Sequence, residues 1–384
     1  MNIIGIICEY NPMHRGHQKQ INRIRQTFGP DSAVVCLMSG NFVQRGAPAI
    51  VDKSLRARAA LSAGADLVLE LPVEAALSSA EGFAAGGVSI LGGFCDDLCF
   101  GAEDANPQAL MDTAAALLSP DFPPRLRAAL DTGASFPAAR QQALTDMGLA
   151  GELVTSPNNI LAVEYCKAIL SQGCSMKPFP IHRGGSYHDT LPDNDNPSAT
   201  ALRRLMNAGA DWSPWVPDGV YDLLKDASIH TLEAGERAIL GRLRTMSEAE
   251  FEALPYGSEG LWRKFMHACH RYARVEDILT ATKSKRYTRT RLDRMLMCAF
   301  LGLTEADLQT PAPYTRILAF NDVGREVLKK AKTTGVFLNA GEKQDSDYCR
   351  REFQMGDLYG LFAVDTPEAP GIEAHRRVYY QHSR

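Results

Sequence analysis

Short apolar runs alternate with longer amphipathic stretches over the first hundred residues. The apolar runs predict strands that are buried on both faces, at 3–7, 33–38, 66–71 and 97–101. The amphipathic stretches between them predict helices at about 16–28, 51–63 (with Arg56 and Arg58 on its surface) and 80–92. This alternation predicts right-handed βαβ units and a parallel sheet, in which ligands bind at the carboxyl ends of the strands.

The pattern changes after about residue 105. It predicts helices over 108–118, 123–148 and 158–172, one more strand over 176–183, and a helix that opens at Ser198. Beyond about residue 215 the pattern is mostly helical, without clear strand alternation, and residues 364–374 suggest a loose tail. We therefore predict an α/β fold, with a Rossmann-like parallel-sheet domain at 1–212 and a mainly helical domain at 213–384.

Composition places the chain among ordinary globular proteins. Of its 384 residues, 45% are hydrophobic and 22% are charged, and the net charge of −4 means that any nucleic-acid surface must be a local patch. The nine cysteines are odd in number, which favours reduced thiols over a disulfide framework. The sequence has no basic leader and no uncharged apolar run of membrane-spanning length. We expect a cytoplasmic protein with no membrane contact and no obligate protein partner.

The turn between the first strand and the first helix carries the strongest candidate chemistry. His14 and His17 are three residues apart, so they share a face at the helix start, and Gly16 leaves room for a phosphate near the backbone. A helix N-terminus attracts anions, and two imidazoles there can donate hydrogen bonds to a triphosphate as a pyrophosphate leaves. Two surface histidines in a turn are the alternative interpretation.

This turn resembles a known signature. His-x-Gly-His after a first strand is similar to the motif of the nucleotidyltransferase superfamily, which includes class I tRNA synthetases and adenylyltransferases. The wider segment from Gly5 to His17, with Glu9-Tyr10-Asn11-Pro12, resembles the start of the bacterial tRNA(Met) cytidine acetate ligase family. The first domain is thereby identified as nucleotidyltransferase-like.

Further segments resemble the same family in order along most of the chain. They are 38–46 (Met-Ser-Gly-Asn-Phe-Val-Gln-Arg-Gly), 65–72, 100–103, 156–161, 187–189, 198–200, 285–288 and 318–321. Met13 and Ala102 stand where the family often has phenylalanine and serine, and both departures are conservative.

The resemblance implies an AMP- and pyrophosphate-forming ligase. Acetate and ATP would give acetyl-adenylate, and the N4 amine of the wobble cytidine in elongator tRNA(Met) would take the acetyl group to give N4-acetylcytidine. Mg²⁺ can arrive with the ATP. The implied catalytic residues are His14 and His17. The implied ATP-binding residues are Ile7, Cys8, Glu9, Tyr10, Asn11, Pro12, Met13, His14, Arg15, Gly16, His17, Gln18, Lys19, Gln20, Gly101, Asn158, His182, Arg183, Ser198 and Thr200.

Several of these residues have plainer interpretations. Arg183 can bond a phosphate in bidentate fashion or form a surface ion pair. Asn158 can contact ATP or cap a helix, and Ser198 and Thr200 can clamp pyrophosphate or simply cap the helix that they open. We expect Asn41, with Gln44, Arg45 and Lys53, to shape the acetate or cytidine pocket, although Lys53 and Arg56 also fit a solvated helix face.

A basic run at 283–294 predicts the RNA-binding surface, because cations bind phosphates and Tyr287 could stack on an unpaired base. Its candidate RNA contacts are Lys285, Arg286, Tyr287, Arg289 and Arg291, and Arg316 could extend the patch. A charged helix face is the alternative. The cysteines and histidines do not have zinc spacing, so we predict no metal site within the protein itself.

Two other functions compete with the RNA-modifying ligase. A small-molecule adenylyltransferase of the same superfamily would use the N-terminal site but leave about 170 C-terminal residues idle. A non-enzymatic tRNA- or ribosome-binding protein would not need His14, Gly16, His17 and Arg183 together.

Overall fold

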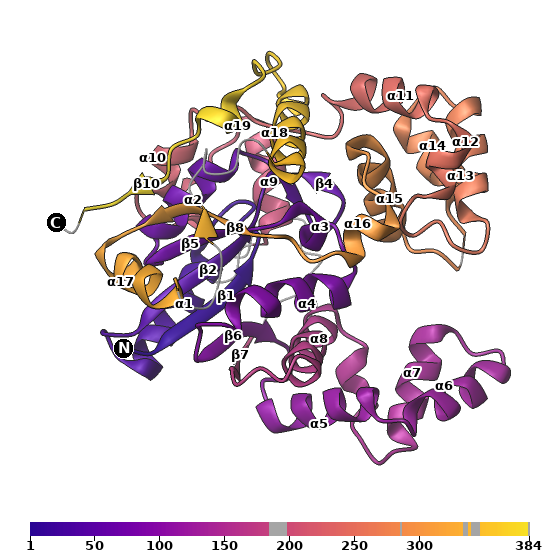
Figure 1. Cartoon of the computed structure of the whole chain (residues 1–384), viewed down its shortest axis with the longest axis horizontal. Coiled ribbons are helices and arrows are strands. Elements are labelled where there is room, and N and C mark those ends of the chain that lie inside the picture. The colour runs from indigo at the N-terminus through magenta and orange to yellow at the C-terminus, as the bar shows by residue number, and fades with distance from the viewer. Residues whose placement is uncertain (184–197, 285, 333–336, 339–345, 383–384) are drawn as a thin grey trace.

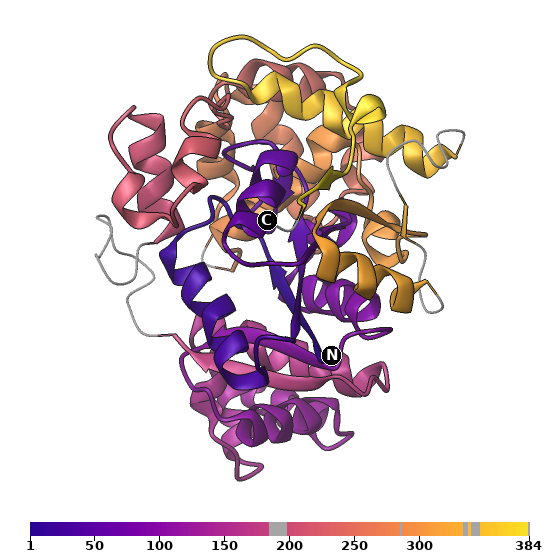
Figure 2. The ribbon, with the colours of Figure 1, turned by 90° about the vertical axis from the view of Figure 1, so that its left-hand side faces the viewer.

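One large β-sheet runs through the protein, with helices on both of its faces (Figures 1 and 2). The computed structural model describes residues 1–183, 198–284, 286–332, 337–338 and 346–382. Within these residues the strand order is β10-β8-β5-β2-β1-β6-β7, with β9 paired to β8. The strands are β1 (Ile3–Cys8), β2 (Ala33–Ser39), β5 (Leu67–Leu71), β6 (Asp97–Ala102), β7 (Lys177–His182), β8 (Thr315–Phe320), β9 (Phe337–Leu338) and β10 (Tyr379–Tyr380).

The five N-terminal strands of this sheet are parallel. The chain builds outward from β1 to β2 and β5, then returns to the other side of β1 to form β6 and β7. The strand order therefore reverses between β1 and β6, which in open α/β sheets is the place where a ligand-binding crevice forms. The prediction of a Rossmann-like parallel sheet is confirmed.

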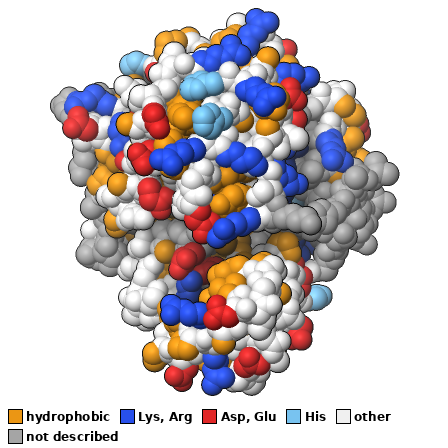
Figure 3. Space-filling view, turned by 90° about the vertical axis from the view of Figure 1, so that its right-hand side faces the viewer, with side chains coloured by type: hydrophobic (Ala, Val, Ile, Leu, Met, Phe, Trp, Pro, Cys, Tyr) orange, Lys and Arg blue, Asp and Glu red, His pale blue; other side chains and the backbone are white. Residues whose placement is uncertain are grey.

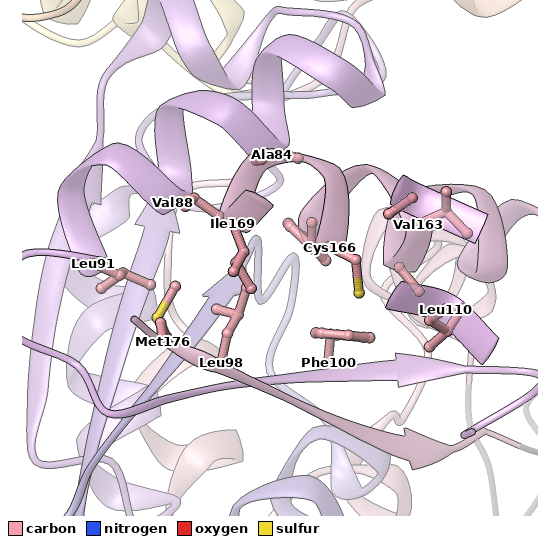
Figure 4. Packing of buried hydrophobic residues seen from close by; sticks show 14 of the residues in the cluster. Ala84, Val88, Leu91, Leu98, Phe100, Leu110, Val163, Cys166, Ile169 and Met176 are labelled. Carbon is pink, nitrogen blue, oxygen red and sulfur yellow. The ribbon is translucent and has the colours of Figure 1, made fainter. Parts of the chain in front are cut away.

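Alternate residues of the strands supply two cores, because successive side chains of a strand point to opposite faces of the sheet. Ile3 and Val35 belong to the core on one face, and Ile4 and Val34 to the core on the other. Figure 4 shows the first core, where Val88 and Ile169 from two helices meet Leu98 and Phe100 of β6. The helices that contribute to this core include α4 (Ala80–Leu91), α5 (Pro107–Leu118), α8 (Pro157–Ser171) and α17 (Asp322–Ala331).

The second core lies under α1 and α2. Its helices are α1 (Arg15–Phe28), α2 (Lys53–Ser62), α9 (Ala199–Asn207) and α10 (Val220–Leu224). A short hairpin of β3 (Phe42–Val43) and β4 (Ala47–Pro48) follows β2 and precedes α2.

The segment from 236 to 309 forms a helical module beside the sheet, at the upper right of Figure 1. Its helices surround a third core that includes Phe251, Phe265 and Leu296. The module consists of α11 (Glu236–Thr245), α12 (Glu248–Glu252), α13 (Leu261–Arg271), α14 (Val275–Thr282), α15 (Arg289–Leu301) and α16 (Glu305–Gln309). The remaining elements are α3 (Val73–Ala76), α6 (Phe122–Asp131), α7 (Phe136–Thr145), η1 (Gly151–Val154), η2 (Ser213–Trp215), α18 (Asp347–Tyr359), η3 (Gly360–Phe362) and α19 (Ile372–His375).

Two sequence expectations about elements are wrong. The helix expected over 123–148 is two helices, α6 and α7, with Gly133 at φ +86° between them. The mostly helical second half is confirmed, but it also returns strands β8, β9 and β10 to the sheet, with β8 antiparallel to β5. An isolated strand gave no alternating pattern to detect. The domain division at residue 212 stays a prediction. Strands β8, β9 and β10 come after this residue but join the sheet that the N-terminal strands form.

The N-terminal turn of α2 is buried, so the expectation that Arg56 lies on the helix surface is wrong. The Arg56 side chain is 0% exposed and donates to the carbonyl oxygens of Glu9 (2.7 Å), Ser39 (3.1 Å) and Gly40, and to that of Val51 (3.0 Å). Since Glu9 and Ser39 lie at the carboxyl ends of β1 and β2, one guanidinium fixes the two strand ends beside the crevice.

Lys53 is also buried, within a network of charges that reaches the C-terminal segment. Its Nζ lies 2.7 Å from Glu70 and 2.7 Å from Glu373, and Glu373 also binds Arg316 (2.8 Å) and Arg376 (2.9 Å). Glu373 is 1% exposed, so the expectation of a loose tail over 364–374 is wrong at this residue. Arg316 is held within this network and therefore does not extend a surface patch.

All nine cysteines are unpaired thiols, and none of the helices in the described ranges is long and apolar enough to cross a membrane.

Replacement of Arg56 tests its role at the strand ends. Arg56→Met should lower the free energy of unfolding by about 4 kcal/mol, because buried carbonyl groups lose their donor. The matched control is Arg58→Met on the same helix, where the guanidinium stacks on Tyr379 at 4.9 Å and the loss should be about 1 kcal/mol. Urea unfolding followed by tryptophan fluorescence measures both. Equal losses in the two variants would contradict this account of Arg56.

Candidate active site

A cavity of about 340 Å³ opens where the strand order reverses between β1 and β6. It is the size expected for a small-molecule site. The carboxyl ends of β1 and β6, the first turns of α1 and α9, the start of α8 and the β3–β4 hairpin surround it. Predicted ATP-binding residues that line it are Ile7, Cys8, Glu9, Tyr10, Asn11, His14, His17, Gln20, Gly101, Asn158, Arg183, Ser198 and Thr200.

His14 and His17 stack on each other at the start of α1, with ring centroids 3.6 Å apart. His14 caps the helix: its Nδ1 accepts from the Gly16 N–H (3.1 Å), while Nδ1 of His17 accepts from the His14 N–H (3.3 Å). A neutral imidazole whose Nδ1 accepts carries its proton on Nε2. Both rings can therefore donate from Nε2, and that atom of His14 is buried without a partner among the described residues.

Both histidines are neutral at physiological pH. Burial, together with the positive charges of Arg183 and Arg203, lowers the pKa of His14 to about 3. Burial, with neighbouring His14 and Arg183, also holds the pKa of His17 well below its usual value. The pair can thus offer hydrogen-bond donors to an anion at neutral pH without titrating.

Positive charge comes instead from two arginines. Arg183 follows β7 and its side chain lies over Gly101, where an added Cβ would stand 3.4 Å from the arginine Cδ. Arg203, on α9, donates to the Asn11 carbonyl oxygen (2.7 Å) and to the Thr200 hydroxyl (3.1 Å). A guanidinium on each side of a cavity with neutral donors suits a polyphosphate.

The start of α9 is built as a helix N-terminus that faces the cavity. Ser198 caps it by accepting from the Ala201 N–H (3.1 Å), and Ser198, Ala199 and Thr200 all line the cavity. The capping interpretation of Ser198 is confirmed. The pyrophosphate interpretation stays a prediction, since a capped helix start can also bind an anion.

Glu103 organises the opposite wall, at the start of α8. Its carboxylate accepts from the Ser156 hydroxyl (2.9 Å), the Asn158 amide group (2.7 Å) and the Asn159 N–H (2.7 Å). These hydrogen bonds lower the pKa of Glu103, although burial opposes them. Asn158 is therefore not the helix cap, since Ser156 precedes it in that position, and Glu103 orients its amide beside the cavity.

The β3–β4 hairpin forms the roof of the cavity. Gln44 and Arg45 line it, as expected, and the Gln44 N–H donates to the Glu9 carboxylate (2.8 Å). Asn41 lies outside the lining; its side chain accepts from the Lys53 N–H (3.0 Å) and so fixes the hairpin base to α2. Lys53 likewise belongs to the buried network and not to the cavity wall.

Some predicted ATP-binding residues flank the cavity without lining it. Met13 is fully buried, Arg15 donates to the Pro214 carbonyl oxygen (2.8 Å), and Nδ1 of His182 lies 2.9 Å from the Glu103 carbonyl oxygen. The complete set is Pro12, Met13, Arg15, Gly16, Gln18, Lys19 and His182.

The basic run at 283–294 has local partners. Arg286 pairs with Glu259 at 2.5 Å, and Arg289 pairs with Glu276 and Asp293, each at 2.7 Å. Arg291 donates to the Tyr256 carbonyl oxygen (2.7 Å) and lies over the ring of Tyr287 at 5.0 Å. Lys285 lies outside the described residues.

Sequence reasoning missed several residues of the cavity wall. Arg203 is one charge on an amphipathic helix, and only its position one turn after Ser198 could have indicated it. Phe83, Leu161 and Tyr165 look like ordinary core positions in the sequence, and they meet at the cavity only because α4 and α8 cross the same strand ends.

The neutral state of His14 predicts a pH effect on stability. The folded pKa of about 3 lies below the usual 6.5, so the unfolded chain binds an extra proton between these values. Stability is complete above pH 6.5 and falls by about 1.4 kcal/mol per pH unit below it. His14→Asn should remove this contribution.

Urea unfolding of wild type and variant at several pH values between 4.5 and 7.5 measures the difference. Gln20→Asn is the matched control, because it changes the same cavity wall without removing a titrating group. Parallel curves for wild type and His14→Asn would refute the buried neutral histidine.

Comparisons with known proteins agree with this site. A family model described as HIGH Nucleotidyl Transferase matches residues 1–369. The tRNA(Met) cytidine acetate ligase of Clostridium acetobutylicum is 37% identical over 358 residues, which are 87% of this chain and 88% of that one. The tRNA(Met) cytidine acetate ligase of Anoxybacillus flavithermus is 37% identical over 349 residues, which are 86% of this chain and 87% of that one.

Solved structures give the same result. The apo crystal structure of Thermotoga maritima TmcAL is 28% identical, with a TM-score of 0.91 over 100% of both chains. Thermotoga maritima TmcAL bound with alpha-thio ATP is 27% identical, with a TM-score of 0.88 over 100% of both chains. The resemblance found in the sequence is thereby confirmed, and the chain belongs to the tRNA(Met) cytidine acetate ligase family of HIGH nucleotidyl transferases.

Proposed function

We propose that this protein activates acetate with ATP and transfers the acetyl group to N4 of the wobble cytidine in elongator tRNA(Met). The observation that carries this is the pair of neutral histidines at the start of α1, flanked by Arg183 and Arg203, in a member of this family. The family relatives carry the name tRNA(Met) cytidine acetate ligase, and a solved relative binds an ATP analogue.

In the first step an acetate oxygen attacks the α-phosphorus of ATP. A P–O bond forms, the bond to the β-phosphate breaks, and pyrophosphate leaves with its electron pair. His14 and His17 would donate from Nε2 to phosphate oxygens whose charge grows in this step. Because His14 and His17 are neutral, they would bind the phosphates through hydrogen bonds alone. These rings then carry no positive charge that would hold back the departing pyrophosphate.

Arg183 and Arg203 would supply the charge. Arg183 stands beside Gly101, where only hydrogen occupies the space that a side chain would fill, and so a nucleotide can approach the strand end. Arg203 already bonds Thr200 in the first turn of α9. Its guanidinium and the N–H groups of that turn would hold the departing pyrophosphate. Mg²⁺ would arrive bound to the triphosphate.

In the second step the cytidine N4 attacks the acetyl carbonyl carbon. The new C–N bond replaces the C–O bond to AMP, and N4 loses a proton. Cytosine N4 is a weak nucleophile, so the adenylate is what makes the step possible. Gln44 and Arg45 on the hairpin line the cavity and are our candidates for the acetate or cytidine contacts, whereas Asn41 would act by fixing the hairpin.

Because the proposed substrate is a tRNA, we expect the protein to act in the cytoplasm, where cysteine thiols stay reduced. A small-molecule adenylyltransferase remains the second candidate, because the cavity alone would serve either reaction. The experiment below separates the two.

Incubation of the protein with labelled acetate, ATP and bulk tRNA should label RNA, and digestion should release labelled N4-acetylcytidine. If label never enters RNA while pyrophosphate exchange depends on a phosphate-bearing metabolite, the small-molecule function is correct. Tight tRNA binding with no ATP turnover would instead favour a protein without enzymatic activity.

His17→Asn tests the role of the histidines. Loss of one donor to the transition state should slow acetate-dependent pyrophosphate exchange by about 10²- to 10³-fold. Affinity for tRNA should stay near that of wild type. His375→Asn, at an exposed position on α19, is the matched control and should keep full activity. Loss of folding or of tRNA binding in His17→Asn would refute the assigned role.

A further inference from the structure

The helical module carries a second cationic surface that does not form a run in the sequence. Helix α13 buries one face, with Leu261, Trp262 and Phe265, in the core of the module. Its opposite face is exposed and consists of cations and histidines. The residues of this α13 face are Arg263, Lys264, His267, His270, Arg271 and, just beyond the helix, Arg274.

Three cations of this face differ in their partners from Arg286 and Arg289 of the 283–294 run. In the ranges that the structure describes, no ion pair joins Arg263, Lys264 or Arg271 to a carboxylate, whereas Arg286 and Arg289 are each paired. Arg263 and Arg271 lie flat over the rings of Trp262 (4.8 Å) and Tyr272 (5.6 Å), which orients the guanidinium groups. Stacking leaves guanidinium N–H groups available to donate.

Two acidic side chains near this face form ion pairs with arginines that lie outside it. Glu250 of α12 pairs with Arg242 at 2.6 Å, and Glu276 of α14 pairs with Arg289. Figure 3 shows this side of the molecule, and its upper part, over α11–α14, carries blue and pale-blue side chains with fewer red ones between them. In a chain with net charge −4, such a concentration of positive charge attracts a polyanion.

The module also adjoins the cavity. Gly46, in the turn of the β3–β4 hairpin, has φ +73°, and an added Cβ would stand 2.3 Å from the backbone carbon of Asp293 in α15. The hairpin that roofs the cavity thus packs directly on the module. Tyr256 gives a second contact, because its hydroxyl donates to the Leu77 carbonyl oxygen (2.7 Å).

We propose that the α13 face binds the RNA backbone, and that the 283–294 run, whose Arg286 and Arg289 are paired with carboxylates and whose Arg291 binds a backbone carbonyl, contributes mainly to the folding of the module. The inference rests on the proposed function, since it concerns the same tRNA substrate. Lys264, Arg271 and Arg263 would contact phosphates, and His267 and His270 would donate to phosphate or 2′-hydroxyl oxygens.

Three double variants test the proposal. The test variant combines Lys264→Gln with Arg271→Gln on α13, and the matched control combines Arg125→Gln with Arg127→Gln on exposed α6. The third variant combines Arg286→Gln with Arg289→Gln in the 283–294 run. Equilibrium binding of tRNA is measured over a range of salt concentrations. The α13 variant should bind tRNA at least tenfold more weakly, and the slope of log affinity against log salt should fall by about 2, one for each lost phosphate contact. The α6 variant should match wild type.

The Arg286/Arg289 variant should instead lower the midpoint of thermal unfolding, with a salt slope near that of wild type. Binding of ATP, measured separately, should be unchanged in the α13 variant. Wild-type tRNA affinity and slope in the α13 variant would overturn this inference while leaving the proposed function intact. If wild type itself binds no tRNA and labels none, the proposed function fails first.

Discussion

A single buried guanidinium holds together the two strand ends beside the crevice. Parallel strands that end next to one another leave carbonyl groups without partners as the chain turns away. Here the carbonyls at the ends of β1 and β2, those of Glu9, Ser39 and Gly40, all accept from Arg56, which is 0% exposed. Buried carbonyls need donors, and one planar group with five N–H bonds can serve several at once. The loop after β1 can therefore bend into the phosphate-binding turn without losing hydrogen bonds.

The same turn of α2 connects this point to the end of the chain. Asp52 caps α2 and pairs with Arg376, with both oxygens at 2.7 Å, while Lys53 binds Glu70 of β5 and Glu373 of α19. Breaking one partner of a buried pair leaves an uncompensated charge, so these contacts specify one arrangement strongly. They fix the C-terminal segment against the same helix that fixes the strand ends.

Within the cavity the work is divided between two kinds of side chain. Burial is the main cause of the lowered pKa of both histidines. The positive charges of Arg183 and Arg203 lower the pKa of His14 further, and Arg183 also lowers the pKa of His17. Cations at all four positions would repel one another when no nucleotide is bound. Two neutral donors beside two cations reduce this repulsion, and all four groups can still bind an anion.

The sequence predicts those features that depend on local pattern. The alternation of strands and helices predicts the parallel sheet, which the structure confirms, and the spacing of His14, Gly16 and His17 at a strand end predicts a phosphate site. The burial of Arg56 could not be predicted, because its partners are backbone atoms, and those of Glu9, Ser39 and Gly40 come from two segments that are distant in the sequence. For the same reason β8 went unnoticed: a strand without alternating neighbours in the chain has no periodicity beyond its own six residues.

Charge is where linear and spatial patterns diverge most. The run at 283–294 stands out in the sequence because its cations are closely spaced, but neighbouring residues on a helix point in different directions and reach different partners. Glu259 and Glu276 come from other segments and pair with Arg286 and Arg289 of the run. The cations of α13 are diluted by apolar residues at helical spacing, and that spacing is what puts them all on one exposed face. An RNA backbone contacts side chains that share one surface, whether or not they are close in the sequence. Cations at helical spacing are therefore the better indicator of an RNA contact.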